Sequence, residues 1–340
     1  MIWLAFTATA VLSLALTGII RRYALKRNLV DIPNQRSSHS VVTPHGGGLA
    51  IVLMFQLTLI VLTCNGDLNS SSLWLYLVAG SLIAALGLLD DIYHIPARWR
   101  LLIHFAASAF AIYWIGGLPQ LLIAGYLLDP GWLGQIGAVI FLVWLLNLYN
   151  FMDGIDGIAG IEAVTVCIGG VVIYWWFGSP DNQWIPPLIL MAATLGFLFW
   201  NFPRAQIFMG DAGSASIGLI IGLFAIQAGW VAPELLWSWV VLLGAFIVDA
   251  SVTLIRRVMR GDKFYEAHRS HAYQYASRKY GNHIGVSLAF GGINLLWLLP
   301  LAFLSAGGWL DGLLALTIAY LPLIWLAFHF KAGARELQEV

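Results

Sequence analysis

The chain has 340 residues, of which 60% are hydrophobic and only 10% charged, and its 17 basic and 17 acidic side chains leave no net charge. This composition excludes an ordinary water-soluble protein and predicts an integral membrane protein, with no nucleic acid among its partners. The two cysteines, Cys64 and Cys167, stand in apolar segments and are too few for a disulfide framework or a zinc site.

Eleven stretches of about 16 to 22 residues carry almost no charge. At ~1.5 Å per helical residue, each can cross a hydrocarbon core of ~30 Å. The sequence therefore predicts an all-α, polytopic membrane protein with about eleven transmembrane helices, forming a single domain over residues 1–340. The expected spans are 2–20, 46–64, 72–89, 100–117, 133–150, 160–177, 185–200, 213–230, 235–255, 285–306 and 309–328.

The basic residues are distributed asymmetrically along this pattern. Every Lys and Arg lies in alternate connecting segments or at the span ends beside them. Since cytoplasmic loops carry the excess of Lys and Arg, these segments are predicted to be cytoplasmic, with a periplasmic amino terminus and a cytoplasmic carboxyl terminus. Arg21 and Arg22 follow the first apolar span instead of preceding it, so this span is expected to remain as an anchor.

The first cytoplasmic segment combines a basic run with residues that end regular structure. Topology and contact with anionic lipid explain the run at 21–27. Two prolines and the glycines at 46–48 interrupt secondary structure and allow a close backbone approach to a ligand. Arg36 and His39, which lie between the prolines, are candidate phosphate ligands.

Asp90 and Asp91 stand at the end of the third predicted span. Adjacent carboxylates at a membrane edge repel each other unless a positive charge lies between them. Hard oxygen ligands favour Mg²⁺ or Mn²⁺ over zinc, which would call for His and Cys. The pair is therefore a candidate cation site, and a solvated pair at a helix end is the simpler alternative.

The segment from Asn147 to Gly160 is the densest polar stretch of the chain. Asn147, Asn150, Asp153 and Asp156 recur every three residues at the cytoplasmic end of the fifth span. If the segment is helical, Asp153 and Asp156 are neighbours on one face, and the interspersed glycines allow the chain to wrap around an anion. We interpret this stretch as the reaction centre. The alternative is a span end whose amides cap the helix while both carboxylates face water.

Residues 201–216 form another candidate site, directly before the eighth span. Two glycines and Ser214 precede an apolar helix, whose free N–H groups would bind an anion. Asp211 would hold a cation that bridges to this anion, and Phe208 offers a stacking face. An ordinary N-cap role for Asp211 is the alternative.

The ninth span and the loop after it carry the last candidates. Asp249 and Arg256 are seven residues apart and so share a helical face, which fits either an ion pair or a catalytic role. In the following loop His268, Arg269 and His271 form a cluster suited to donate hydrogen bonds to phosphate oxygens. Two histidines also suggest zinc, but no third soft ligand is near in sequence.

All of these candidates fall on the predicted cytoplasmic side, where nucleotides are found. Acidic groups for a divalent cation and basic donors for a transferring group are the parts that phosphoryl transfer needs. A position at the membrane edge suits a water-soluble donor and a lipid acceptor. The residues alone therefore predict a metal and polyphosphate site at this edge.

Five motifs, taken in order, resemble one known family. They are Asp-Ile-Pro-Asn-Gln-Arg-Ser-Ser-His from Asp31, Pro-His-Gly-Gly-Gly from Pro44, Leu-Asp-Asp from Leu89, Asn-Leu-Tyr-Asn-Phe-Met-Asp-Gly-Ile-Asp-Gly from Asn147, and Phe-Met-Gly-Asp-Ala-Gly-Ser from Phe208. From Asp31 to His271 the chain resembles the polyprenyl-phosphate N-acetylhexosamine-1-phosphate transferases, the family of WecA and MraY. It looks closest to bacterial members that initiate O-antigen synthesis, such as WbpL.

The resemblance implies an activity and its partners. A UDP-sugar would donate N-acetylhexosamine 1-phosphate, or that of a related amino sugar, to undecaprenyl phosphate. The products would be UMP and a lipid-linked sugar diphosphate that starts O-antigen, lipopolysaccharide or related surface polysaccharide synthesis. Mg²⁺ would be required, with Mn²⁺ as a substitute. The protein would lie among the lipids of the bacterial inner membrane with its active site on the cytoplasmic face, and a homodimer is one expected assembly.

The resemblance also implies roles for individual residues. The catalytic set would be Asp90, Asp91, Asp153 and Asp156, and the metal ligands would be Asp211 and Asp91. Substrate contacts would come from Arg36, His39, Asn147, Asn150, Asn201, Phe208, His268, Arg269 and His271. Of these, Asn201 and Phe208 would contact the uracil ring. His268 and His271 would bind the donor phosphates. The family often has a denser histidine cluster there, so Arg269 is expected to replace one histidine contact.

Two chemical routes and two other functions stay open at this point. The lipid phosphate attacks the β-phosphorus directly, with Asp90 taking any residual proton, or an Asp first forms a phospho-sugar intermediate. Direct attack is favoured because a phosphate monoester, with a second pKa of ~6, is already largely ionised. A flippase for a lipid-linked sugar would need charges near mid-span, where Asp249 comes nearest. A CDP-lipid phosphatidyltransferase would concentrate its carboxylates in one helix pair.

Overall fold

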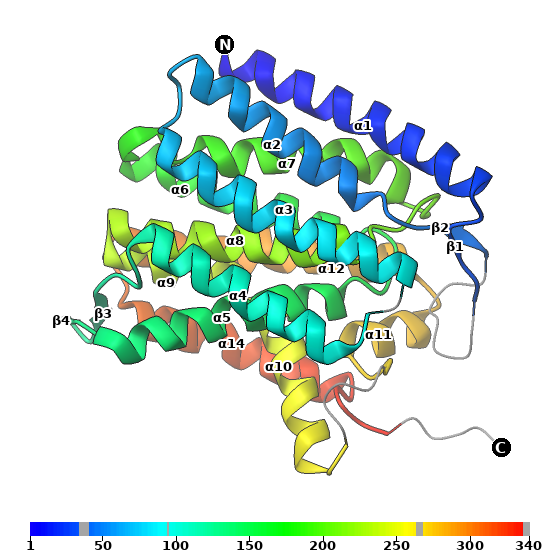
Figure 1. Ribbon diagram of the computed structural model, residues 1–340. Helices are drawn as coiled ribbons and strands as arrows, with labels where there is room; N and C mark the ends of the chain where they lie inside the picture. The colour runs from blue at the N-terminus through cyan, green and yellow to red at the C-terminus, as the bar shows by residue number, and fades with distance from the viewer. Residues whose placement is uncertain (34–40, 94, 263–267, 336–340) are drawn as a thin grey trace.

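The computed structural model describes residues 1–33, 41–93, 95–262 and 268–335, which form a bundle of long helices with two short hairpins (Figure 1). The helices are α1 (Ile2–Lys26), α2 (Gly48–Cys64), α3 (Ser70–Tyr93), α4 (Ala97–Ile115), α5 (Gly131–Met152), α6 (Ile158–Phe177), η1 (Pro180–Asn182), α7 (Ile185–Asn201), α8 (Asp211–Val231), α9 (Pro233–Leu242), α10 (Gly244–Met259), α11 (Ala272–Tyr280), α12 (His283–Ile293), η2 (Asn294–Leu298), α13 (Leu299–Ala306) and α14 (Gly312–His329). The hairpins pair β1 (Val30–Asp31) with β2 (Thr43–Pro44), and β3 (Leu121–Ile123) with β4 (Tyr126–Leu128), both antiparallel.

The apolar runs of the sequence became helices. Each of the eleven predicted spans overlaps one helix or a run of two or three consecutive helical elements. Within the described residues, eight helices are long and apolar enough to cross a membrane, and α9 with α10 would make a ninth. The polytopic all-α membrane fold is therefore confirmed, while the count of eleven stays a prediction. The amino terminus and the chain beyond α14 lie at opposite ends of the bundle (Figure 1), and the side that each end faces also stays a prediction.

The ninth predicted span, 235–255, is not one continuous helix. It is divided into α9 and α10, which meet at 68°, and α10 projects from the bundle (Figure 1). The Tyr320 hydroxyl donates to the Val240 carbonyl at 2.7 Å. Its ring lies 2.8 Å from where a Cβ of Gly244 would be. A side chain inserted at a glycine is a known cause of helix bending, and here it comes from α14.

Glycines bring three helices together at the start of α8, the most buried span. A Cβ added to Gly48 of α2 would lie 2.3 Å from the Gly213 Cα. A Cβ on Gly87 of α3 would lie 2.3 Å from the Ala212 nitrogen. Small residues let helix backbones approach closely in membranes. The first residues of α8 are therefore in backbone contact with both α2 and α3.

We predict that Gly48→Ala lowers the melting temperature of the detergent-purified protein, because the added methyl group must displace α8 backbone. Overpacking of this kind costs about 1–3 kcal/mol. Gly137→Ala in α5 is the matched control, since its added Cβ meets nothing within 4 Å. Equal melting temperatures for the two variants, measured by scanning fluorimetry, would contradict the close approach.

Candidate active site

Five of the predicted aspartates line one cavity of about 680 Å³. They come from three separate parts of the chain. Asp90 and Asp91 lie in the last turn of α3, and Asp211 is the first residue of α8. Asp153 and Asp156 lie in the turn between α5 and α6, so they meet in the cavity without sharing a helix face. The structure thus brings together the acidic clusters that the sequence placed on one side.

Arg100 of α4 bridges two of these clusters. Its Nη1 bonds to Asp90 Oδ2 and lies 3.3 Å from Asp211 Oδ2. The backbone N–H of Ile95 donates to the other Asp90 oxygen at 2.7 Å. An arginine that joins two carboxylates lowers their mutual repulsion and fixes their orientation. The sequence reasoning missed this role because a basic residue at a span end is equally explained by topology.

Two histidines lie beside the other carboxylates of the cavity. His45 Nδ1 lies 3.7 Å from Asp91 Oδ2, and His283 Nδ1 lies 3.3 Å from Asp156 Oδ2. The nearby Asp91 carboxylate raises the pKa of His45 above its ordinary value, against the opposing effect of burial. The Pro-His-Gly-Gly-Gly motif is the one sequence signal that pointed to His45, and nothing in the sequence singled out His283.

Asp153 is surrounded by groups that disfavour its charged form. Burial raises its pKa to about 7, and the carboxylates of Asp211, Asp156 and Asp91 add to the effect. Burial and neighbouring carboxylates both favour the neutral form of this carboxyl group.

The donor chemistry of the cavity fits a hard divalent cation. Asp91 Oδ2 is buried without a hydrogen-bond partner among the described residues. In that part of the chain, no three His, Cys, Asp or Glu side chains are grouped closely enough to hold an ion by themselves. Mg²⁺ is usually bound by one or two carboxylates plus waters and substrate phosphates. The residues present fit such an ion, completed by a phosphate ligand.

The anion site predicted at the start of α8 stays a prediction, and two of its N–H groups have acceptors within the helix end. The N–H groups of Gly213 and Ser214 already donate to the Gly210 carbonyl, at 3.0 and 3.1 Å. The Ser214 hydroxyl donates to Asn150 Oδ1 at 2.9 Å, which joins α8 to α5. Gly210 has φ +74°, and a Cβ there would lie 2.8 Å from Asp91 Oδ2. The glycine thus serves the close approach of α3 and α8.

Asn201 and Phe208, predicted to contact a uracil ring, both line the cavity. Asn201 Oδ1 accepts from the Gly157 N–H at 3.0 Å, and its Nδ2 donates to the Ile207 carbonyl at 3.0 Å. These bonds tie the turn after α5 to the loop before α8. Phe208 is fixed by backbone pairing, because its N–H donates to the Pro44 carbonyl at 2.8 Å.

Asn147 lies outside this cavity and lines a second, mostly apolar groove of about 320 Å³. Helices α3, α4, α5 and α8 form its walls, with Leu254 of α10. The groove and the acidic cavity share the side chains of Asp90, Asn150 and Asp211. The apolar groove therefore borders the acidic cavity at these shared residues.

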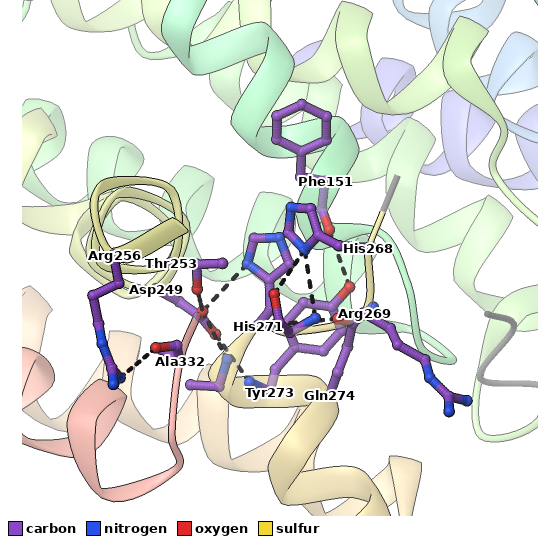
Figure 2. Close-up of polar contacts among 12 residues, drawn as sticks. Phe151, Asp249, Thr253, Arg256, His268, Arg269, His271, Tyr273, Gln274 and Ala332 are labelled. Carbon is purple, nitrogen blue, oxygen red and sulfur yellow. Dashed lines mark hydrogen bonds and ion pairs between the residues drawn. The ribbon is translucent and has the colours of Figure 1, made fainter. Parts of the chain in front are cut away.

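His268, Arg269 and His271, here called the histidine loop, are not among the described residues that line the cavity. His271 is buried, with Nδ1 3.3 Å from Asp249 Oδ1 (Figure 2). His268 stacks on His271, and burial, with the nearby charges of His271 and Arg257, lowers its pKa to about 3. The Arg269 side chain extends away from both rings (Figure 2).

Several role assignments stay predictions. The contacts predicted for the histidine loop with donor phosphates are not tested by this geometry. Arg36 and His39 lie outside the described residues.

A helical membrane bundle with five carboxylates around one cavity, next to an apolar groove, fits the class of polytopic membrane enzymes with an acidic candidate active site. Residues 73–229 match the family described as glycosyl transferase family 4. Three relatives show how far the similarity extends.

The chain is 30% identical over 275 residues to a probable undecaprenyl-phosphate N-acetylglucosaminyl 1-phosphate transferase of Bacillus subtilis, covering 79% of this chain and 75% of that protein. It is 27% identical over 342 residues to a decaprenyl-phosphate N-acetylglucosaminephosphotransferase of Mycolicibacterium smegmatis, covering 86% and 81%. It is also 27% identical over 267 residues to a phospho-N-acetylmuramoyl-pentapeptide-transferase of Oceanobacillus iheyensis, covering 74% and 80%. The chain belongs to glycosyl transferase family 4, the WecA- and MraY-like enzymes, and is a sugar-1-phosphate transferase.

We predict that Asp153→Asn stabilises the metal-free protein at high pH while abolishing activity. The folded-state pKa of Asp153, about 7, lies above the ordinary value of 3.8, so the folded state holds a proton that the unfolded chain releases. Stability is therefore unaffected by Asp153 below pH 4, falls as pH rises, and stays reduced above pH 7. Melting temperatures in EDTA should fall more steeply between pH 5 and 7 for the unmodified protein than for the variant. Parallel curves would contradict this.

Proposed function

We propose that this protein transfers an N-acetylhexosamine 1-phosphate from a UDP-sugar to undecaprenyl phosphate, releasing UMP, and that it begins O-antigen or related polysaccharide synthesis at the cytoplasmic face of the inner membrane. One observation carries the proposal. The apolar groove and the acidic cavity meet at Asp90, Asn150 and Asp211, so a lipid and a polar substrate reach the same atoms. The names of the relatives support a polyprenyl-phosphate acceptor and an N-acetylglucosamine donor group.

The groove suits the acceptor. Its walls are mostly apolar, as a polyprenyl chain requires, and Arg100 stands where it opens into the cavity. A guanidinium binds phosphate oxygens in a fixed fork geometry. Arg100 is partly exposed and already spans Asp90 and Asp211, so the lipid phosphate would be held beside both carboxylates.

The cavity suits the donor. Asp91 and Asp211 would hold Mg²⁺, which supplies charge neutralisation to the diphosphate when bound. Phe208 offers its ring to the uracil base, and Asn201 fixes the loop that leads to it. His45 and His283 add hydrogen-bond donors on the cavity wall. Manganese would substitute for magnesium because both prefer oxygen ligands.

The reaction follows from this arrangement as a direct displacement. An oxygen of the lipid phosphate attacks the β-phosphorus of the UDP-sugar and forms a new P–O bond. The bond from that phosphorus to the α–β bridging oxygen breaks, and UMP leaves with the electron pair. Asp90, held by Arg100, accepts any proton left on the lipid phosphate. The ionised monoester needs little base, since its second pKa is ~6.

The assay for this proposal is UMP release by purified protein with undecaprenyl phosphate, Mg²⁺ and a panel of UDP-N-acetylhexosamines. We expect release with at least one sugar, loss of release in EDTA, and recovery with Mg²⁺ or Mn²⁺. Asp211→Asn should lower the rate by orders of magnitude with unchanged folded yield. Absence of UMP with every sugar would contradict the proposal, and CMP release from a CDP-lipid or sugar-lipid translocation without chemistry would support the alternatives.

A second prediction concerns the acceptor. Arg100→Ala should raise the KM for undecaprenyl phosphate about 10- to 100-fold, the effect of losing a charged hydrogen bond. The KM for the UDP-sugar should change much less. Arg98→Ala is the matched control, because Arg98 is exposed on the same helix and contacts the Trp99 ring. An unchanged acceptor KM for Arg100→Ala would contradict the assigned role.

A further inference from the structure

Asp249 of α10 is buried and is not paired as its helical spacing suggested. Arg256, seven residues later, donates instead to the Ala332 carbonyl beyond α14. Asp249 accepts from the backbone N–H groups of Ala272 and Tyr273, at 2.9 and 3.0 Å (Figure 2). These N–H groups belong to the first turn of α11, where a helix has no internal acceptors. A carboxylate from α10 therefore caps α11.

The same carboxylate orients the histidine that precedes α11. His271 Nδ1 lies 3.3 Å from Asp249 Oδ1, and Thr253 donates to that oxygen at 3.2 Å. The His271 ring stacks on Tyr273 on one side and on His268 on the other, with centroids 5.6 and 4.9 Å apart. The start of α11 is thus a stacked set of rings anchored to one buried carboxylate (Figure 2).

The other side of this stack contacts the end of α5. The Tyr273 hydroxyl donates to the Phe151 carbonyl at 3.0 Å. A Cβ added to Gly154 would lie 2.2 Å from that hydroxyl and 3.2 Å from Gln274 Nε2. Asp153 lies between these two contact points, and Gln274 lines the acidic cavity. The first turn of α11 is therefore packed directly against the turn that carries Asp153.

We propose that Asp249 and Tyr273 are positioning residues for Asp153. Asp249 fixes the first turn of α11, Tyr273 in that turn holds the carbonyl of Phe151, and this contact sets the course of the chain into the cavity. Neither side chain lines the acidic cavity, so both act through another residue. Catalytic geometry is sensitive to displacements of about 1 Å, which can change rates ~100-fold. The inference rests on the proposed transfer activity for its kinetic readout.

The first test compares two tyrosines of α11. Tyr273→Phe removes only the hydroxyl that bonds Phe151. We expect kcat to fall about 10-fold or more, with KM for both substrates within about 3-fold, because binding groups stay in place while Asp153 shifts. Tyr275→Phe is the matched control, since its hydroxyl contacts the Arg335 carbonyl away from the cavity. Equal kcat for the two variants would overturn the proposal.

The second test asks whether the two residues act as one unit. Asp249→Asn keeps an acceptor oxygen and the side-chain volume. The double variant with Tyr273→Phe should lose no more kcat than the more damaging single variant. If the kcat losses of the two single variants multiply in the double variant, Asp249 and Tyr273 act independently. That result would contradict the proposal that Asp249 acts through Tyr273.

A structural readout separates this inference from the proposed function. In Asp249→Asn, amide hydrogen exchange should accelerate at 151–156 as well as in the first turn of α11. Faster exchange confined to α11 would overturn the proposed positioning of Asp153, even if the protein has transfer activity. If exchange accelerates both at 151–156 and in α11, but the protein transfers no sugar phosphate, the positioning of Asp153 is supported. The proposed transfer function alone is then contradicted.

Discussion

Mutual repulsion among carboxylates is the constraint on which this site depends. Five aspartates converge beside apolar helix ends, where uncompensated charge is costly. Arg100, His45 and His283 each meet one or two of them. Burial and the neighbouring carboxylates raise the pKa of Asp153 to about 7. Binding of the proposed cation and phosphate would replace this repulsion by attraction.

Backbone packing creates the repulsion by forcing the aspartates together. Glycine contacts bring α2 and α3 against the start of α8, which places Asp211 beside the end of α3. Asn201 ties the turn after α5 to the loop before α8. On the far side, α11 packs against that same turn through Tyr273. The acidic cavity is thus assembled from helix ends that are each fixed by contacts outside it.

The sequence was sufficient for the helices and for the convergence of the aspartates, because hydropathy is local and alternate loops share a membrane side. It was not sufficient for the compensating groups. Membrane topology alone explains a basic residue at a span end, so the sequence does not single out Arg100. No motif surrounds His283. Helical spacing left open an ion pair between Asp249 and Arg256, whereas the structure pairs that carboxylate with N–H groups of α11. The bend at Gly244 depends on Tyr320, which only the fold brings there.

The most direct measurement of the central claim is Mn²⁺ binding followed by electron paramagnetic resonance, in the presence of a UDP-N-acetylhexosamine. We expect a bound ion in the unmodified protein and its loss in both Asp91→Asn and Asp211→Asn, because the two carboxylates come from different helices and would serve one ion. Both variants should stay folded, since each removes a charge from a repulsive cluster. Undiminished Mn²⁺ binding in either variant would contradict a metal site shared by Asp91 and Asp211.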